Sequence, residues 1–157
     1  AGQVAIQKQL EEIRTLLNSG NAVFEAPRPN PGKLATRIRA AILARSGFEV
    51  AVIVVTATEL DSIVAENPLT EFSKEPSKGL VAFLADAATR TRARSLLVDS
   101  WVPERYAVGS QAAYLWCPGG VLDSKLGKSL AKATGESVTS RNWATVIKLQ
   151  QVCGPRA

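Results

Sequence analysis

The stretch Leu80-Val81-Ala82-Phe83-Leu84, residues 80–84, decides the fold of this chain together with the elements that follow it. A short, continuous apolar run of this kind is typical of a buried strand. A basic helix is predicted next over residues 87–98, and residues 105–108 and 113–117 predict a hairpin around Gly109-Ser110. This order of strand, helix and hairpin is the first part of a split β–α–β unit.

The remainder of the chain completes the same pattern. Ser124 is placed to cap a helix that ends near Gly135, and a short strand is predicted at Val138. Trp143 and Val146 then fall on the apolar face of a last amphipathic helix, where Trp143 is expected to be a core anchor. The second half therefore predicts the βαββαβ order of a ferredoxin-like unit.

The first half predicts a similar order of elements. They are a helix, a hairpin, a helix, a buried strand and a capped helix, over residues 1–12, 13–17 with 22–25, 33–46, 50–55 and 56–67. One further strand before Gln3 would make the two halves alike. We therefore expect an α+β fold of two tandem ferredoxin-like (βαββαβ, α/β plait) subdomains, the first without its opening strand. The expected boundaries are residues 1–67, a linker over residues 68–78, and residues 79–157.

Composition limits the class of protein. With 157 residues, 46% hydrophobic and 21% charged, the chain can bury a globular core. Its net charge of +5 suits an anionic partner, although an inert basic surface would give the same value. Cys117 and Cys153 are too far apart for a metal or redox motif, so a reduced, cytoplasmic protein is expected. No apolar run approaches the roughly 20 residues that cross a bilayer, so no membrane partner is expected.

Several catalytic chemistries are excluded by residue type. The chain has no histidine, which rules out a Cys-His or Ser-His nucleophile pair and a histidine zinc site within it. Gly127-Lys128-Ser129 resembles the end of a phosphate-binding loop, but Leu122 stands where that motif needs glycine. Ser129 and Lys132 have the spacing of a serine–lysine dyad, yet the lysines here are more simply a solvated helix face. We expect no metal and no cofactor, and the sequence leans away from an enzyme.

The turn Asn18-Ser19-Gly20-Asn21 is the first candidate binding element. Glycine and asparagine supply the positive φ that a tight turn needs, so the turn has a purely structural interpretation. The alternative is a nest of backbone N–H groups that holds an anion.

The segment that opens the last predicted helix is the second candidate. Arg141, Asn142 and Thr145 lie near a helix N-terminus, which favours anions, and Lys148 lies on another flank of the same helix. The alternative is that Ser140 or Asn142 caps the helix and does nothing more.

Strand aromatics give a test of nucleic-acid binding. Alternation places Tyr114 and Trp116 on one face of the predicted sheet. If that face were open, the two rings would be available to stack on bases, which would favour nucleic acid as the ligand.

The chain also resembles the bacterial proteins grouped as domain of unknown function 1697. The motifs that carry the resemblance run from about Ile13 to Leu149, and the most specific is the ending Arg141-Asn142-Trp143-Ala144-Thr145-Val146-Ile147-Lys148-Leu149. The resemblance implies two ferredoxin-like subdomains and no established activity. It also implies an opening strand with an Arg-Gly-Ile-Asn-Val-Gly-like stretch, which this sequence does not contain.

Three hypotheses for function follow. The first is non-enzymatic binding of an anionic ligand, nucleic acid or nucleotide-like, through residues 18–21 and 141–148. The second is an enzyme that acts by positioning and cationic stabilisation on a phosphorylated or carboxylate small molecule. Its charges would come from Arg14, Lys125, Arg141 and Lys148, with Asp123 or Glu104 as the proton carrier. The third is a structural or self-association module that pairs exposed sheet edges.

Overall fold

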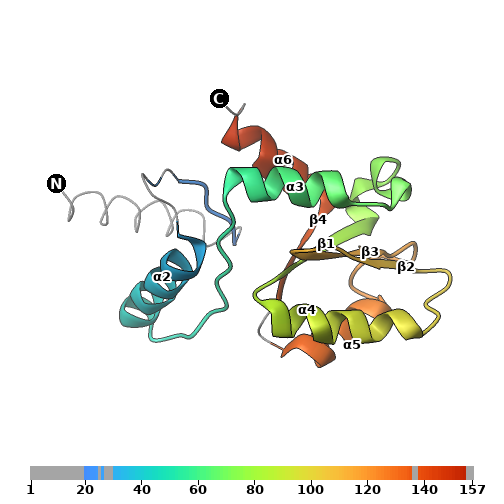
Figure 1. Ribbon diagram of the computed structural model, residues 1–157, viewed down its shortest axis with the longest axis horizontal. Helices are drawn as coiled ribbons and strands as arrows, with labels where there is room; N and C mark the ends of the chain where they lie inside the picture. Colours follow the sequence, from blue (N-terminus) through green and yellow to red (C-terminus); the bar gives the residue numbers. More distant parts are fainter. Residues whose placement is uncertain (1–19, 25, 27–29, 136–137, 155–157) are drawn as a thin grey trace.

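The protein has an α+β architecture built on one antiparallel sheet of four strands (Figure 1). The computed structural model describes residues 20–24, 26, 30–135 and 138–154. The strands stand in the order β2-β3-β1-β4, so that β1 lies between β3 and β4. Their bounds are Gly79–Leu84 for β1, Arg105–Val108 for β2, Ala112–Trp116 for β3 and Val138–Asn142 for β4.

Helices cover both faces of this sheet. In Figure 1, α3 (Ala57–Glu66) and α6 (Trp143–Cys153) lie above it, and α4 (Ala87–Arg94) and α5 (Lys125–Thr134) lie below it. Alternation along β1 divides the core accordingly. Val81 and Phe83 pack with the α3 and α6 side, and Ala82 and Leu84 pack with the α4 and α5 side.

The second-half predictions agree closely with the structure. Ser124 caps α5 by accepting a hydrogen bond from the Gly127 amide, and Gly135 ends that helix. The predicted basic helix is shorter than expected, because α4 gives way to a 3₁₀ turn, η3, over Ser95–Val98. The last strand is longer than expected and includes Arg141 and Asn142, which the sequence predicts at the start of the helix.

The first half differs more from its prediction. The helices are found as α2 (Pro31–Ser46) and α3, and the Thr56–Glu59 capping box of α3 is complete. The strands predicted over residues 22–25 and 50–55 are wrong for the described residues, since residues 22–24 and 50–55 lie outside every ladder. A strand needs a neighbour to pair with, and the described chain supplies none there. The helix and strand predicted over residues 1–17 lie outside the described residues.

The segment expected to be a linker contributes to the core. It forms two 3₁₀ turns, η1 (Thr70–Ser73) and η2 (Pro76–Lys78), and buries Leu69 and Phe72 beneath α3 and α6. Phe72 also explains why residue 79 is glycine, because a Cβ at Gly79 would lie 2.6 Å from the Phe72 ring. The division into residues 1–67 and 79–157 stays a prediction. Among the described helices, none has the length and hydropathy needed to cross a bilayer.

Candidate functional site

Arg141 joins the last strand to the N-terminal turn. Its Nε donates to Asn21 Oδ1 at 2.6 Å, and its Nη2 donates to the Gly20 carbonyl at 2.6 Å. Its Nη1 donates to Thr139 Oγ1 at 3.0 Å and to the Ser140 carbonyl at 2.7 Å. Two predicted candidate elements, far apart in sequence, are therefore in direct contact.

The turn residue Gly20 is required by this contact. Its φ is 73°, which favours glycine, and a Cβ there would lie 3.0 Å from Arg141 Nη2. The conformation and the close approach of the guanidinium both select against a side chain. Asn18 and Ser19, the other members of the predicted turn, lie outside the described residues.

The guanidinium of Arg141 is a half-buried charge held by neutral groups. All four of its acceptors are carbonyl, amide or hydroxyl oxygens, and no carboxylate in the described part of the chain forms an ion pair with it. Burial lowers the pKa of Arg141, but a guanidinium stays protonated in proteins. A positive charge in this setting is stabilised by any anion that reaches it.

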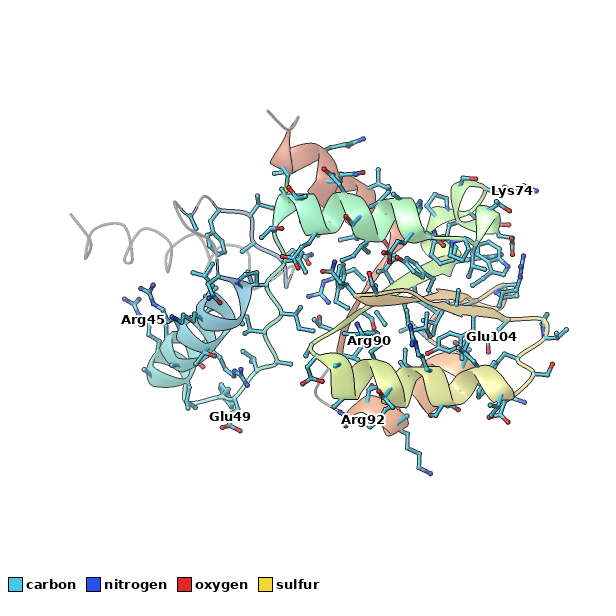
Figure 2. The ribbon with its side chains drawn as sticks, viewed as in Figure 1. Arg45, Glu49, Lys74, Arg90, Arg92 and Glu104 are labelled. Atoms are coloured by element: carbon cyan, nitrogen blue, oxygen red, sulfur yellow. The ribbon has the colours of Figure 1, made fainter. Side chains whose placement is uncertain are left out.

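A cavity of about 590 Å³ opens beside Arg141. Its walls are mainly aliphatic and come from residues 20–24 and 26, from α2, α3, α6 and the sheet, and from the segment before α3. No Asp or Glu is present among the described residues that line it. The main wall residues are Leu34, Ile38, Ile42, Val50–Val55, Leu60, Phe83 and Leu149. Figure 2 shows Arg45 and Glu49, at the far end of α2, pointing away from the sheet.

Two hydrogen-bond donors of this site have no acceptor among the described residues. A guanidinium carries five N–H groups, and the hydrogen bonds of Arg141 to described residues occupy four of them, which leaves one on Nη2. Thr139 Oγ1 accepts from Arg141, so its own hydroxyl hydrogen is available to donate elsewhere. Both residues line the cavity. A carboxylate offers two oxygens to two such donors.

The other predicted site residues do not join this cluster. Asn142 caps α6 by accepting from the Thr145 amide at 2.9 Å, which is the structural alternative of the sequence analysis. Lys148 is exposed on α6, and Lys125 begins α5 on the opposite face of the sheet. Arg14 lies outside the described residues.

The proton carriers considered for an enzyme are placed elsewhere. Glu104 accepts hydrogen bonds from the Ser124 hydroxyl and the Leu126 amide, so it caps α5. Figure 2 shows it at the end of the sheet away from α2. Asp123 is exposed in the loop before α5. Burial raises the pKa of Cys117 to about 11, which keeps that thiol protonated and unreactive.

The strand aromatics are not available for base stacking. Tyr114 and Trp116 share a face, as alternation predicted, but α3, α6 and η1 cover that face. Tyr114 is 0% exposed and donates its hydroxyl to the Ile63 carbonyl at 2.5 Å. Among the described residues, no group of His, Cys, Asp and Glu is arranged to hold a metal ion.

Sequence reasoning missed Thr139 and the walls of the cavity. Thr139 had a signal, because residues two apart on a strand share a face and Arg141 was already a candidate. No sequence signal marks the aliphatic walls of the cavity, because residues 50–55 have the same composition as a buried strand.

A family model described as "Protein of unknown function (DUF1697)" matches residues 3–114. The matched range includes Gly20, Asn21 and the Val50–Val55 wall, and it ends before Arg141. No curated protein matches the chain, and no solved structure matches it.

Proposed function

We propose that this chain, which belongs to the DUF1697 family of proteins of unknown function, is a non-enzymatic binding protein for a small organic anion with an apolar body. The observation that carries the proposal is the Arg141 guanidinium, held by neutral acceptors beside an aliphatic cavity of about 590 Å³. That volume lies in the range of roughly 300–1,000 Å³ that small-molecule sites occupy.

The chemistry of the cavity favours a carboxylate over a nucleotide. Arg141 and Thr139 together offer two donors and one positive charge. A nucleotide would bring several phosphate charges and a base with polar edges, for which the aliphatic walls offer no partners. Nucleic acid is disfavoured further, because helices cover the strand aromatics on which bases would stack.

We also propose that residues 79–142 form a ferredoxin-like plait. The strand order β2-β3-β1-β4, the antiparallel pairs and the placement of α4 and α5 on one face support this. A second such unit in the first half stays a prediction, because the described residues 22–24 and 50–55 lie outside every ladder. Cys117 and Cys153 form no disulfide among the described residues, which agrees with function in the reducing cytoplasm.

Calorimetric titration with octanoate tests the proposed function. Octanoate has one carboxylate and an apolar chain, and octanamide is its uncharged control. We expect octanoate to bind, and Arg141→Gln to weaken binding about 10- to 100-fold, since a hydrogen bond to a charged group contributes about 1.5–3 kcal/mol. Lys148→Gln removes the same charge from an exposed position on α6 and should leave the affinity unchanged.

Two results would overturn the proposal. One is equal affinity for octanoate and octanamide, which would remove the role of the charge. The other is an equal loss of octanoate affinity in Arg141→Gln and Lys148→Gln, which would show only a general effect of net charge. A urea midpoint for each variant establishes that it is folded.

A further inference from the structure

The strand β2 leaves one edge of the sheet without a partner among the described residues. It stands first in the order β2-β3-β1-β4, and Figure 1 shows it at the edge away from α2. The opposite edge, β4, is the one that meets residues 20 and 21 through Arg141. Three strand spacings of about 4.8 Å separate the two edges, so β2 is remote from that contact.

The backbone of Tyr106 and Val108 faces outward from this edge. The Gly109 amide donates to the Ala112 carbonyl at 2.7 Å, which sets the alternation of the β2–β3 ladder. Because hydrogen-bonded pairs alternate along an antiparallel ladder, β2 bonds to β3 through its odd-numbered residues. The N–H and C=O groups of Tyr106 and Val108 make no hydrogen bond with the described residues. An edge of this kind is a template for a further strand.

A second copy of β2 fits this edge in a symmetric, antiparallel register. When Tyr106 stands opposite Val108 of the second copy, the two-fold axis passes beside Ala107, and all four outward groups of each copy are bonded. An aromatic residue opposite a β-branched one is a favourable cross-strand pair. The small side chain of Ala107 allows the two strands to approach at the axis.

The same register brings opposite charges together. Arg105 then stands opposite Gly109 of the second copy, in a pair without hydrogen bonds, where side chains lie closest. A Cβ on Gly109 would lie 2.7 Å from Oε2 of Glu66 in the same chain, so the Glu66 carboxylate borders that position. Each Arg105 therefore meets the Glu66 carboxylate of the other copy.

The side chains of Arg105 and Glu66 lie on the same face of the sheet. Arg105 stands opposite Trp116, which packs on the α3 and α6 side, and Glu66 is the last residue of α3. Arg105 binds Glu71 through Nη1 alone, at 2.7 and 2.8 Å. Its Nε and Nη2 donors have no acceptor among the described residues and are available to a second carboxylate.

We propose that the protein forms a symmetric dimer through β2, which joins the two four-stranded sheets into one. The strands pair antiparallel about Ala107, and Arg105 of each copy binds Glu66 of the other. The proposal goes beyond the small-anion function and does not depend on it, because β2 and Glu66 take no part in lining the cavity.

Sedimentation equilibrium of the full chain over a range of concentrations tests the proposal. The unchanged chain should dimerise. Arg105→Glu alone and Glu66→Arg alone each place like charges in both contacts, and each should weaken dimerisation at least tenfold. An equimolar mixture of the two variants should dimerise again, since each reversed charge then meets its opposite. A role of either residue only within its own chain would not be restored by mixing.

A backbone variant provides a second readout. Val108→Pro removes an outward N–H that the ladder with β3 does not use, which is where an edge strand tolerates proline. Val108→Ala is the matched control, because it loses the side chain and keeps the N–H. Val108→Pro should dimerise at least tenfold more weakly than Val108→Ala, and a urea midpoint for each variant establishes that it is folded.

Three results would overturn the proposal. The first is an unchanged chain that stays monomeric at every concentration. The second is a mixture of Arg105→Glu and Glu66→Arg that associates no better than either variant alone. The third is equal association of Val108→Pro and Val108→Ala, which would place the contact between copies elsewhere.

Discussion

Replacing Tyr114 with Phe tests how the helical layer that carries a cavity wall is fixed to the sheet. Tyr114 on β3 is 0% exposed, and its hydroxyl donates to the Ile63 carbonyl of α3 at 2.5 Å. The amide that would ordinarily bond this carbonyl belongs to Asn67, which instead donates to Val64. Leu60, one turn earlier on α3, lines the cavity.

The expected cost follows from this geometry. Tyr114→Phe removes one oxygen atom and creates almost no void, so packing loss contributes little. It leaves the Ile63 carbonyl buried without a partner, which costs about 1–3 kcal/mol. With a urea dependence of about 2 kcal/mol per molar, the unfolding midpoint should fall by roughly 0.5–1.5 M.

Urea denaturation followed by tryptophan fluorescence measures this change, and Tyr106→Phe is the matched control. The Tyr106 hydroxyl donates to the Ala93 carbonyl at 2.7 Å, but that carbonyl also accepts from the Ser95 amide. Loss of the Tyr106 hydroxyl should therefore lower the free energy of unfolding by less, about 0.5–1 kcal/mol. Equal midpoints for Tyr114→Phe and the unchanged protein, or a larger loss in Tyr106→Phe, would refute the reasoning.

Three further predictions concern charge and reactivity. The hydrogen bonds from Ser110 lower the pKa of Glu66 in the folded protein below its ordinary value of 4.5. Ionised Glu66 therefore stabilises the fold at pH values above 4.5, and this stabilisation is lost as the pH falls through the lower pKa of the folded state. Urea midpoints between pH 6 and pH 3 should therefore fall less steeply in Glu66→Gln, and an equal slope would contradict this. Cys117 should react with a thiol reagent at pH 8 only after unfolding, and rapid labelling located at Cys117 rather than at the half-buried Cys153 of the native protein would show that Cys117 is not buried. Glu104→Ala should cost about 1–3 kcal/mol at pH 7 because the Ser124 hydroxyl and the Leu126 amide lose their acceptor, whereas an unchanged urea midpoint would exclude this capping role.

Local signals predicted the second half well because each element carries its own cap or periodicity. Ser124 and Gly135 bound α5, and the apolar run of β1 is buried as expected. The boundary at Arg141 was placed too early, because Arg141-Asn142 fits a helix start as well as a strand end. Asn142 is both the last strand residue and the helix cap.

The strand predicted over Val50–Val55 shows what local signals cannot supply. β-branched composition favours a strand, but a strand forms only when a neighbour completes its hydrogen bonds. Similarly, the sequence named Gly20, Asn21 and Arg141 as candidates but could not place them in contact, since the pairing spans about 120 residues of chain. The aliphatic walls that give the site its chemistry come from packing of separate helices.

The most direct test of the account is the side-chain NMR spectrum of Arg141. The Nε–H signal of Arg141, assigned by comparison with Arg141→Gln, should shift on titration with octanoate and stay in place with octanamide. The signals of Arg90, which belongs to α4 on the other face of the sheet and donates to the Ser110 carbonyl, should not move with either compound. The claim that this guanidinium binds anions would be contradicted if neither compound shifts the Arg141 signal. It would also be contradicted if the Arg90 signal shifts as much as the Arg141 signal.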